Sequence, residues 1–199
     1  MLRPNMAMDA PPTEISVGGA PYPIRTDFRI WIEVGEKLRE LLPTMESDAE
    51  LLHNAIVLSE LCEMTLGRPA EWRRGEDYME FLREIGAFMA GYPRAPVGTG
   101  ENGTRTYSFE WDINEIIMAI MCQYGVDLRF GAECHWWIFL EYFRNLAGEH
   151  QILKLMEIRG YDGKDAELKK RAARFALPRA QTAADARTIK EINELFYNC

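Results

Sequence analysis

Residues 76–93 read EDYMEFLREIGAFMAGYP, and this stretch carries the clearest periodicity in the chain. Its large apolar residues recur at i, i+3, i+4 and i+7, which is the spacing of one helix face. These residues are Tyr78, Phe81, Leu82, Ile85, Phe88, Met89 and Tyr92. Charged residues fill the other side, and Pro93 cannot continue a helix. The stretch therefore predicts an amphipathic helix that ends at this proline.

Helical spacing recurs towards the N-terminus. A helix capped by Thr26 or Asp27 is expected to run to the next proline, because both residues are favoured N-caps. A second helix is expected to begin with Ser47 and Glu50, whose spacing is that of a capping box, and to stop near Gly67.

Helical spacing also dominates the second half of the chain. Asp112 and Glu115 are expected to cap a helix that Gly125 closes. Residues 132–146 are apolar almost all round, which indicates a helix buried at the centre of the fold. Further helices are expected at 151–158, at 165–177 and from Thr182 onwards. Since there is no internal repeat and almost no period-two alternation, the predicted fold class is all-α, a compact multi-helix domain.

The domain organisation follows from composition. Residues 1–24 are rich in Pro, Gly and Ala and are expected to form a flexible or extended N-terminal arm. Residues 25–199 are expected to form a single helical domain. Within it, the Pro, Gly, Thr and Asn of residues 93–106 predict one flexible loop between two helical halves.

Composition and charge exclude several classes of function. The net charge of -8 repels phosphate backbones and acidic membrane surfaces, so neither nucleic acid nor a membrane is an expected partner. No apolar run is long enough for a signal peptide or a membrane span. The four cysteines are widely spaced and form no CxxC pair, as expected of a protein in a reducing cytoplasm.

Two motifs that can bind a cofactor or a metal ion lack the sequence context that such binding requires. Gly98, Gly100 and Gly103 spell GxGxxG, but no strand precedes them and no helix follows at once, so a flexible loop is favoured over a dinucleotide site. Cys134 and His135 are adjacent, and neighbours on a helix point about 100° apart, which disfavours joint chelation. We therefore expect no cofactor, no metal and no small-molecule ligand.

Catalytic groups are also not apparent. Cys62 and Cys122 lie in apolar helical contexts, without a neighbouring base. Glu110, Asp112 and Glu115 cluster, but the last two are explained as helix-capping groups. We therefore expect that the protein is not an enzyme.

Three features suggest contact surfaces, each with a simpler structural explanation. Trp136 and Trp137 suit an interface, although their apolar helix favours the core. Methionines offer adaptable contact surface and also fill cores, among them Met79, Met89, Met118 and Met121. One basic run suits RNA or an acidic partner, but a solvated helix face is favoured. It consists of Lys169, Lys170, Arg171, Arg174 and Arg179.

An ordered series of short motifs runs through the chain. It comprises TDFRIW at 26–31, FEWD at 109–112, QYGVDL at 123–128, HWWIF at 135–139 and MEIRGY at 156–161. This series resembles the bacteriophage gene-product-fifteen family of long-tailed phages and prophages, over about residues 25–177. The resemblance carries no catalytic residues.

The resemblance implies a tail assembly chaperone in the host bacterial cytoplasm. Its expected partners are the tape-measure protein and the tail tube protein, with self-association. The alternatives are a structural tail-completion or connector component of the virion, and a small enzyme with a polar pocket. Fold-defining or partner-contact candidates are Asp27, Phe28, Arg29, Trp31, Tyr124, Gly125, Asp127, His135, Trp136, Trp137 and Arg159.

Overall fold

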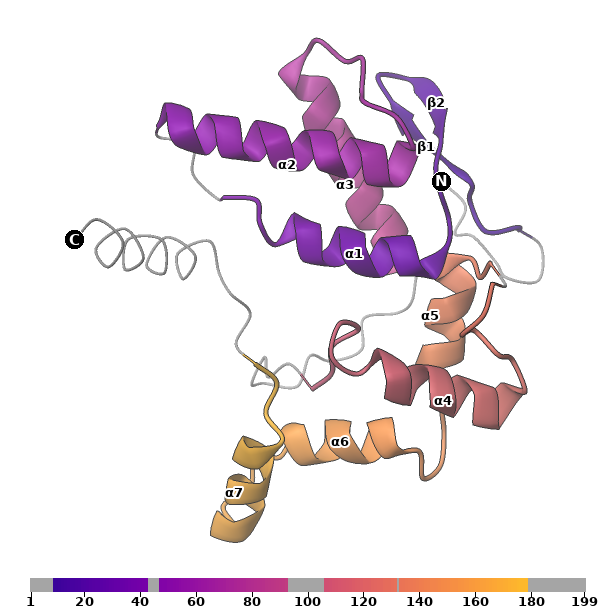
Figure 1. Ribbon diagram of the computed structural model, residues 1–199, viewed down its shortest axis with the longest axis vertical. Helices are drawn as coiled ribbons and strands as arrows, with labels where there is room; N and C mark the ends of the chain where they lie inside the picture. The colour runs from indigo at the N-terminus through magenta and orange to yellow at the C-terminus, as the bar shows by residue number, and fades with distance from the viewer. Residues whose placement is uncertain (1–8, 43–46, 93–105, 132, 179–199) are drawn as a thin grey trace. The chain divides into compact units, whose positions relative to one another are not determined.

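The computed structural model describes residues 9–42, 47–92, 106–131 and 133–178, and these residues are mostly helical (Figure 1). The elements are β1 (Glu14–Val17), β2 (Ala20–Pro23), α1 (Phe28–Leu38), α2 (Asp48–Leu66), α3 (Gly75–Ala90), α4 (Ile113–Tyr124), α5 (Trp136–Arg144), α6 (Gln151–Arg159) and α7 (Ala166–Arg174). The prediction of a helical fold is confirmed, and the small sheet is an addition to it. Among the described residues, no helix combines the length and the apolar character needed to cross a membrane.

The described residues divide into two compact units. We call Pro12–Met89 the N-terminal unit and Ala90–Pro178 the C-terminal unit, which also includes residues 9–11. The prediction of a single domain over residues 25–199 stays a prediction. The GxGxxG motif, nearly all of the 93–106 loop, the helix expected from Thr182 and Cys199 lie outside the described residues.

A hairpin opens the N-terminal unit, where we expected a flexible or extended arm. β1 and β2 pair antiparallel, with Ile15 opposite Tyr22. Gly18 and Gly19 form the two-residue turn with φ of 59° and 77°, as the mirror-image hairpin turns require. Ile15 and Val17 alternate with polar residues and are buried. This period-two stretch is only four residues long, too short to stand out against the helical periodicity around it.

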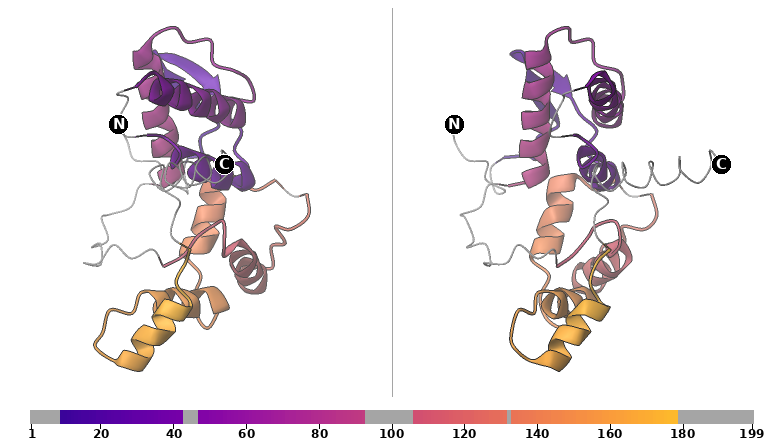
Figure 2. Two further views of the ribbon diagram at one scale, coloured as in Figure 1. Left: turned by 60° about the vertical axis from the view of Figure 1, so that its left-hand side comes forward. Right: turned by 90° about the vertical axis from the view of Figure 1, so that its left-hand side faces the viewer.

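Three helices form the rest of the N-terminal unit. α1 and α2 lie side by side and cross the same face of α3, as the end-on view in Figure 2 shows. Phe28, Trp31 and Val34 of α1 are buried, and the Trp31 ring lies 4.2 Å from that of Phe88 between centroids. The backbone N–H of Gly18 donates to Glu80 of α3, which fixes the hairpin to the helices.

α5 is largely buried in the C-terminal unit, as its apolar sequence predicted. Trp136, Trp137, Phe139, Leu140 and Phe143 are all buried. The ring of Phe109, which precedes α4, packs against the rings of Trp136, Phe139 and Phe143. α4 contacts α5 and α6, and α6 contacts α7.

Candidate interaction site

The outward face of α2 carries several large apolar residues. Leu52 is 64% exposed and Ile56 is 51% exposed, and Leu51 beside them is also exposed. In α3, Met79 is 59% exposed. Single exposed apolar residues are normal, but several on one helix face form a patch, and such patches mark interaction sites.

The inward face of α2 begins instead with polar groups. Ser47 and Glu50 form the predicted capping box, and the Glu50 side chain is buried. One turn later, Asn54 is buried and forms two hydrogen bonds with the backbone of Leu42, one accepted from its N–H and one donated to its carbonyl. These bonds join the start of α2 to the segment that follows α1. They turn Leu52 and Ile56 outward.

A groove lies between α2 and α3. Its volume is about 810 Å³, and its wall is mostly apolar. The lining residues are Ala55, Leu58, Ser59, Pro69, Ala70, Gly75, Glu76, Tyr78, Met79 and Arg83. A helical segment with an apolar stripe is the kind of ligand that such grooves bind.

Acidic side chains dominate the two helices that form the groove. α2 carries four carboxylates and no Lys or Arg. α3 carries four carboxylates and one cation, Arg83, which lines the groove together with Glu76. Glu60 of α2 pairs with Lys37 of α1 at 2.9 Å, and this bond raises the pKa of Lys37. The groove itself is mostly apolar, and its lining contains one carboxylate, Glu76, and one cation, Arg83.

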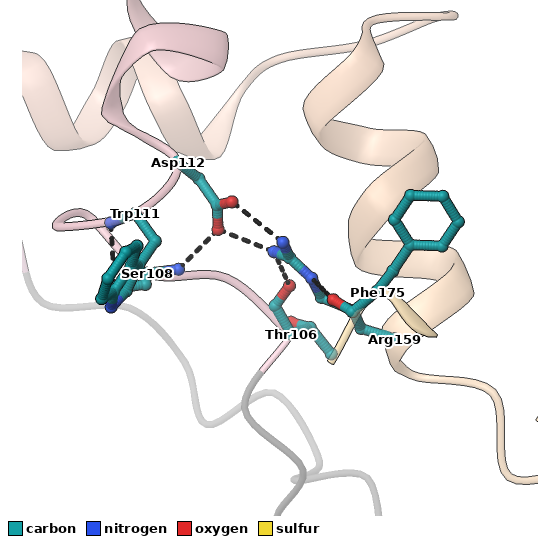
Figure 3. Close-up of polar contacts among 6 residues, drawn as sticks. All are labelled: Thr106, Ser108, Trp111, Asp112, Arg159 and Phe175. Carbon is teal, nitrogen blue, oxygen red and sulfur yellow. Dashed lines mark hydrogen bonds and ion pairs between the residues drawn. The ribbon is translucent and has the colours of Figure 1, made fainter. Parts of the chain in front are cut away.

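A second arrangement of polar groups is centred on Arg159 in the C-terminal unit (Figure 3). Its guanidinium forms a bidentate ion pair with Asp112 and also donates to the backbone carbonyls of Thr106 and Phe175. The Asp112 carboxylate additionally accepts the backbone N–H of Ser108 at 2.9 Å. These contacts join the start of α4, the end of α6 and the segment after α7, so their role is structural.

The expectation that Asp112 caps α4 with its side chain is wrong. Asp112 occupies the N-cap position but makes no side-chain capping bond, because Arg159 and Ser108 engage its carboxylate. Glu115 lies in the first turn of α4, where a negative charge suits the helix dipole.

Comparison with known proteins finds a family to which this part of the chain is similar. Residues 86–182 match the family model described as Bacteriophage Gp15 protein. These residues are similar to that family. The chain matches none of the curated proteins and none of the solved structures with which it was compared. We call residues 86–182 the Gp15 region. It contains α4 to α7, and the lining of the groove precedes it.

This similarity supports a bacteriophage protein of the structural or assembly class. It confirms the resemblance over the Gp15 region, while the TDFRIW motif at 26–31 lies outside the matched residues.

The aromatic candidates of the Gp15 region lie in its core. Trp136 is 2% exposed and Trp137 is 6% exposed, and the ring of Trp137 packs against that of Tyr92. His135 is the N-cap of α5, since its Nδ1 accepts the backbone N–H of Trp137 at 3.1 Å. The helix therefore begins at Trp136, later than the expected start at residue 132.

The three candidates at the end of α4 form a turn. The Tyr124 hydroxyl donates to the carbonyl of Asn145 at 2.8 Å. Gly125 ends α4 in the left-handed conformation, as predicted. Asp127 is exposed and pairs with Arg129, whose guanidinium and backbone N–H lower the pKa of the Asp127 carboxyl to about 2.

The remaining candidates begin α1 in the N-terminal unit. The Asp27 side chain accepts the backbone N–H of Arg29 and pairs with its guanidinium, which confirms the predicted cap. The Arg29 guanidinium lies over the Phe28 ring. The indole N–H of Trp31 donates to the carbonyl of Arg25 at 2.7 Å. Phe28 and Trp31 are buried, so neither offers a contact surface in the isolated unit.

Metal-ligating groups do not converge in the part of the chain that the structure describes. There, no three His, Cys, Asp or Glu side chains are placed to hold a metal ion. Cys62 and Cys134 are buried, and burial raises the pKa of the Cys62 thiol to about 12. Cys122 is exposed on α4, which the apolar sequence around it did not suggest.

One feature of the sequence indicates exposed apolar residues near the groove, and our prediction did not use it. α2 contains the adjacent apolar pair Leu51 and Leu52 and then the run Ile56, Val57 and Leu58. Such runs place apolar residues on more than one helix face, so some of them must remain exposed unless the helix is fully buried.

Proposed function

We propose that this protein is a phage tail assembly chaperone that binds other proteins and does not act as a catalyst. The groove between α2 and α3 is the observation that supports this proposal. It binds an amphipathic helical segment of the tape-measure protein and keeps that protein soluble in the host cytoplasm until tube subunits assemble around it. The Gp15 family supports a role of the structural or assembly class.

The chemistry of the groove fits a helical client. A chaperone for long helical chains needs an apolar surface that many similar helices can occupy, without a cofactor. The flexible side chain of Met79 and the small side chains of Ala55 and Ala70 allow different apolar side chains to be accommodated. Leu52 and Ile56 are further exposed apolar residues of α2.

Co-expression with the tape-measure protein of the same phage tests the proposal. The full chain is expected to raise the soluble fraction of that protein and to elute with it in a pull-down. The groove variant Ala55→Lys/Met79→Lys changes two exposed residues of the groove lining and is expected to lose both effects. Phe130→Lys is the matched control, because Phe130 is 79% exposed in the C-terminal unit, which does not form the groove.

Two results would overturn the proposal. One is a tape-measure protein that stays insoluble and does not elute with the wild-type chain. The other is recovery of the chain from purified particles as a stoichiometric component, which would make it a structural tail-completion or connector subunit.

A further inference from the structure

The groove wall formed by α3 carries two opposite charges, one on either side of an apolar side chain. Glu76, Met79 and Arg83 all line the groove, and all three are exposed. Their spacing of three and then four positions places them on one face of the helix. Glu76 and Arg83 are seven positions apart, which is about 10 Å along the helix axis. The α2 residues in the lining are all uncharged, so these two side chains carry the charge of the groove.

Both charges are available to a ligand. Within the described part of the chain, neither Glu76 nor Arg83 has an ion-pair partner. Glu80 in the same helix differs, because it accepts the backbone N–H of Gly18 and so holds the hairpin. Glu76 and Arg83 can therefore pair with side chains of a segment that lies in the groove.

Other charges lie beside the groove but outside its lining. Residues 68–77 contain three arginines and three carboxylates, so their net charge is zero. The arginines are Arg68, Arg73 and Arg74, and none of them lines the groove. Mixed charges of this kind largely cancel at a distance and are screened by salt. The charge preference of the groove therefore depends on the lining residues themselves.

The separation of the two lining charges favours a helical ligand over an extended one. In a helix that lies along α3, residues seven positions apart are also about 10 Å apart and share nearly the same face. In an extended segment, the same distance spans about three residues, whose side chains point to opposite faces. A helix can therefore place one partner opposite each charge and an apolar side chain against Met79 between them.

We infer that Glu76 and Arg83 select which helical segments this groove binds. The preferred segment carries a basic and an acidic residue seven positions apart, with apolar residues between them on the same face. The basic residue pairs with Glu76 and the acidic residue with Arg83, so charge complementarity decides between segments of equal apolar character. This inference rests on the groove being the helix-binding site of the proposed function, and it adds which client segments are preferred.

Fluorescence anisotropy of the full chain with four labelled peptides tests the inference. The peptides share one leucine stripe and have about 18 residues, long enough for an isolated helix to form. Three of them carry Lys and Glu, Lys and Lys, or Glu and Glu at two positions seven apart. The fourth carries Lys and Glu five positions apart, which turns them about 140° from each other. The wild-type chain is expected to bind the first peptide about fivefold more tightly than each of the others, the size of one exposed ion pair.

Charge reversal at either lining residue should change the preferred peptide. Arg83→Glu leaves two carboxylates in the lining and is expected to bind the Lys/Lys peptide best. Glu76→Arg leaves two cations and is expected to bind the Glu/Glu peptide best. Lys170→Glu is the matched control for Arg83→Glu, because it changes the net charge equally at an exposed residue of α7 outside the groove. The order of the peptides is expected to stay as in the wild type.

Several outcomes would overturn the inference. They are no binding or equal binding of the four peptides by the wild-type chain, tightest binding of the Lys/Lys peptide by that chain, and an order that neither charge reversal changes. A change of order in Lys170→Glu would also overturn it, because net charge and not the lining would then decide.

The tape-measure pull-down separates this inference from the proposed function. If the wild-type chain solubilises the tape-measure protein through the groove but binds all four peptides equally, only the charge selection is wrong. If the chain prefers the peptide with Lys and Glu seven apart and does not bind the tape-measure protein, only the choice of client is wrong.

Discussion

The guanidinium of Arg159 binds both carboxylate oxygens of Asp112, with N–O distances of 2.7 and 3.0 Å, and both side chains are largely buried. Arg159 is the last residue of α6, and Asp112 directly precedes α4. A bidentate pair of this kind fixes direction as well as distance.

Removing one partner of this pair should be strongly destabilising. Asp112→Leu leaves the guanidinium buried without its carboxylate, and the expected loss in the free energy of unfolding is about 3–5 kcal/mol by urea denaturation. The double variant Asp112→Leu/Arg159→Met removes both charges and is expected to lose less than Asp112→Leu alone. A single-variant loss below roughly 1 kcal/mol would instead indicate a solvated, weak pair.

The two tryptophans of the N-terminal unit should respond differently to loss of the indole N–H. Among the described residues, the buried Nε1 of Trp72 has no hydrogen-bond partner, while that of Trp31 donates to Arg25. An unpaired buried donor lowers the free energy of unfolding by about 1–3 kcal/mol, and a phenylalanine side chain has no such donor. Trp72→Phe is therefore expected to be nearly neutral or stabilising, and Trp31→Phe destabilising, in thermal melts. A larger loss for Trp72→Phe would contradict this assignment.

Alanine substitutions at two glycines distinguish the cost of a left-handed backbone from the cost of steric crowding. Gly91 and Gly125 have φ of 73° and 70°, so alanine at either position adopts a left-handed backbone at a cost of about 1–2 kcal/mol. A Cβ at Gly91 would also lie 2.8 Å from Leu140, whereas nothing lies within 4 Å at Gly125. Gly91→Ala is therefore expected to lose more stability in urea denaturation than Gly125→Ala. Equal losses would show that Leu140 moves aside freely.

The described cysteines should differ in reactivity towards a thiol reagent. Only the thiolate reacts, and burial raises the pKa of Cys62 to about 12, so its thiolate is scarce near neutral pH. Cys122 is exposed and is expected to react first in the native protein, with Cys62 and Cys134 reacting only after unfolding. The measurement uses a Cys199→Ser background, with peptide mapping of the modified residues. Rapid native labelling of Cys62 would show that its site opens readily.

Periodicity predicted the helices well because it depends on local spacing. The cap at Asp27, the capping box at Ser47 and the left-handed end at Gly125 were all recognisable from residue type and position. Each of these contacts spans only a few residues. The apolar stretch around Trp136 likewise predicted a buried central helix, which the structure confirms.

Contacts between residues far apart in the sequence could not be predicted from local spacing. Asp112 has the residue type of a side-chain cap, and only the fold brings Arg159, 47 positions away, to its carboxylate. The groove was missed for a related reason. α2 is apolar on several sides, so its sequence does not reveal which side faces solvent, and Asn54 gave no sign that it would reach Leu42.

The position of Asn54 has a wider consequence for α2. Burial of apolar side chains alone would favour rotations of this helix about its axis that turn its leucines inward. Several such rotations would be similar in energy. The two hydrogen bonds between the Asn54 amide and the backbone of Leu42 are directional, so they select one orientation. Two hydrogen bonds thus fix the rotation of α2 about its axis and keep the apolar side chains of Leu52 and Ile56 exposed to solvent.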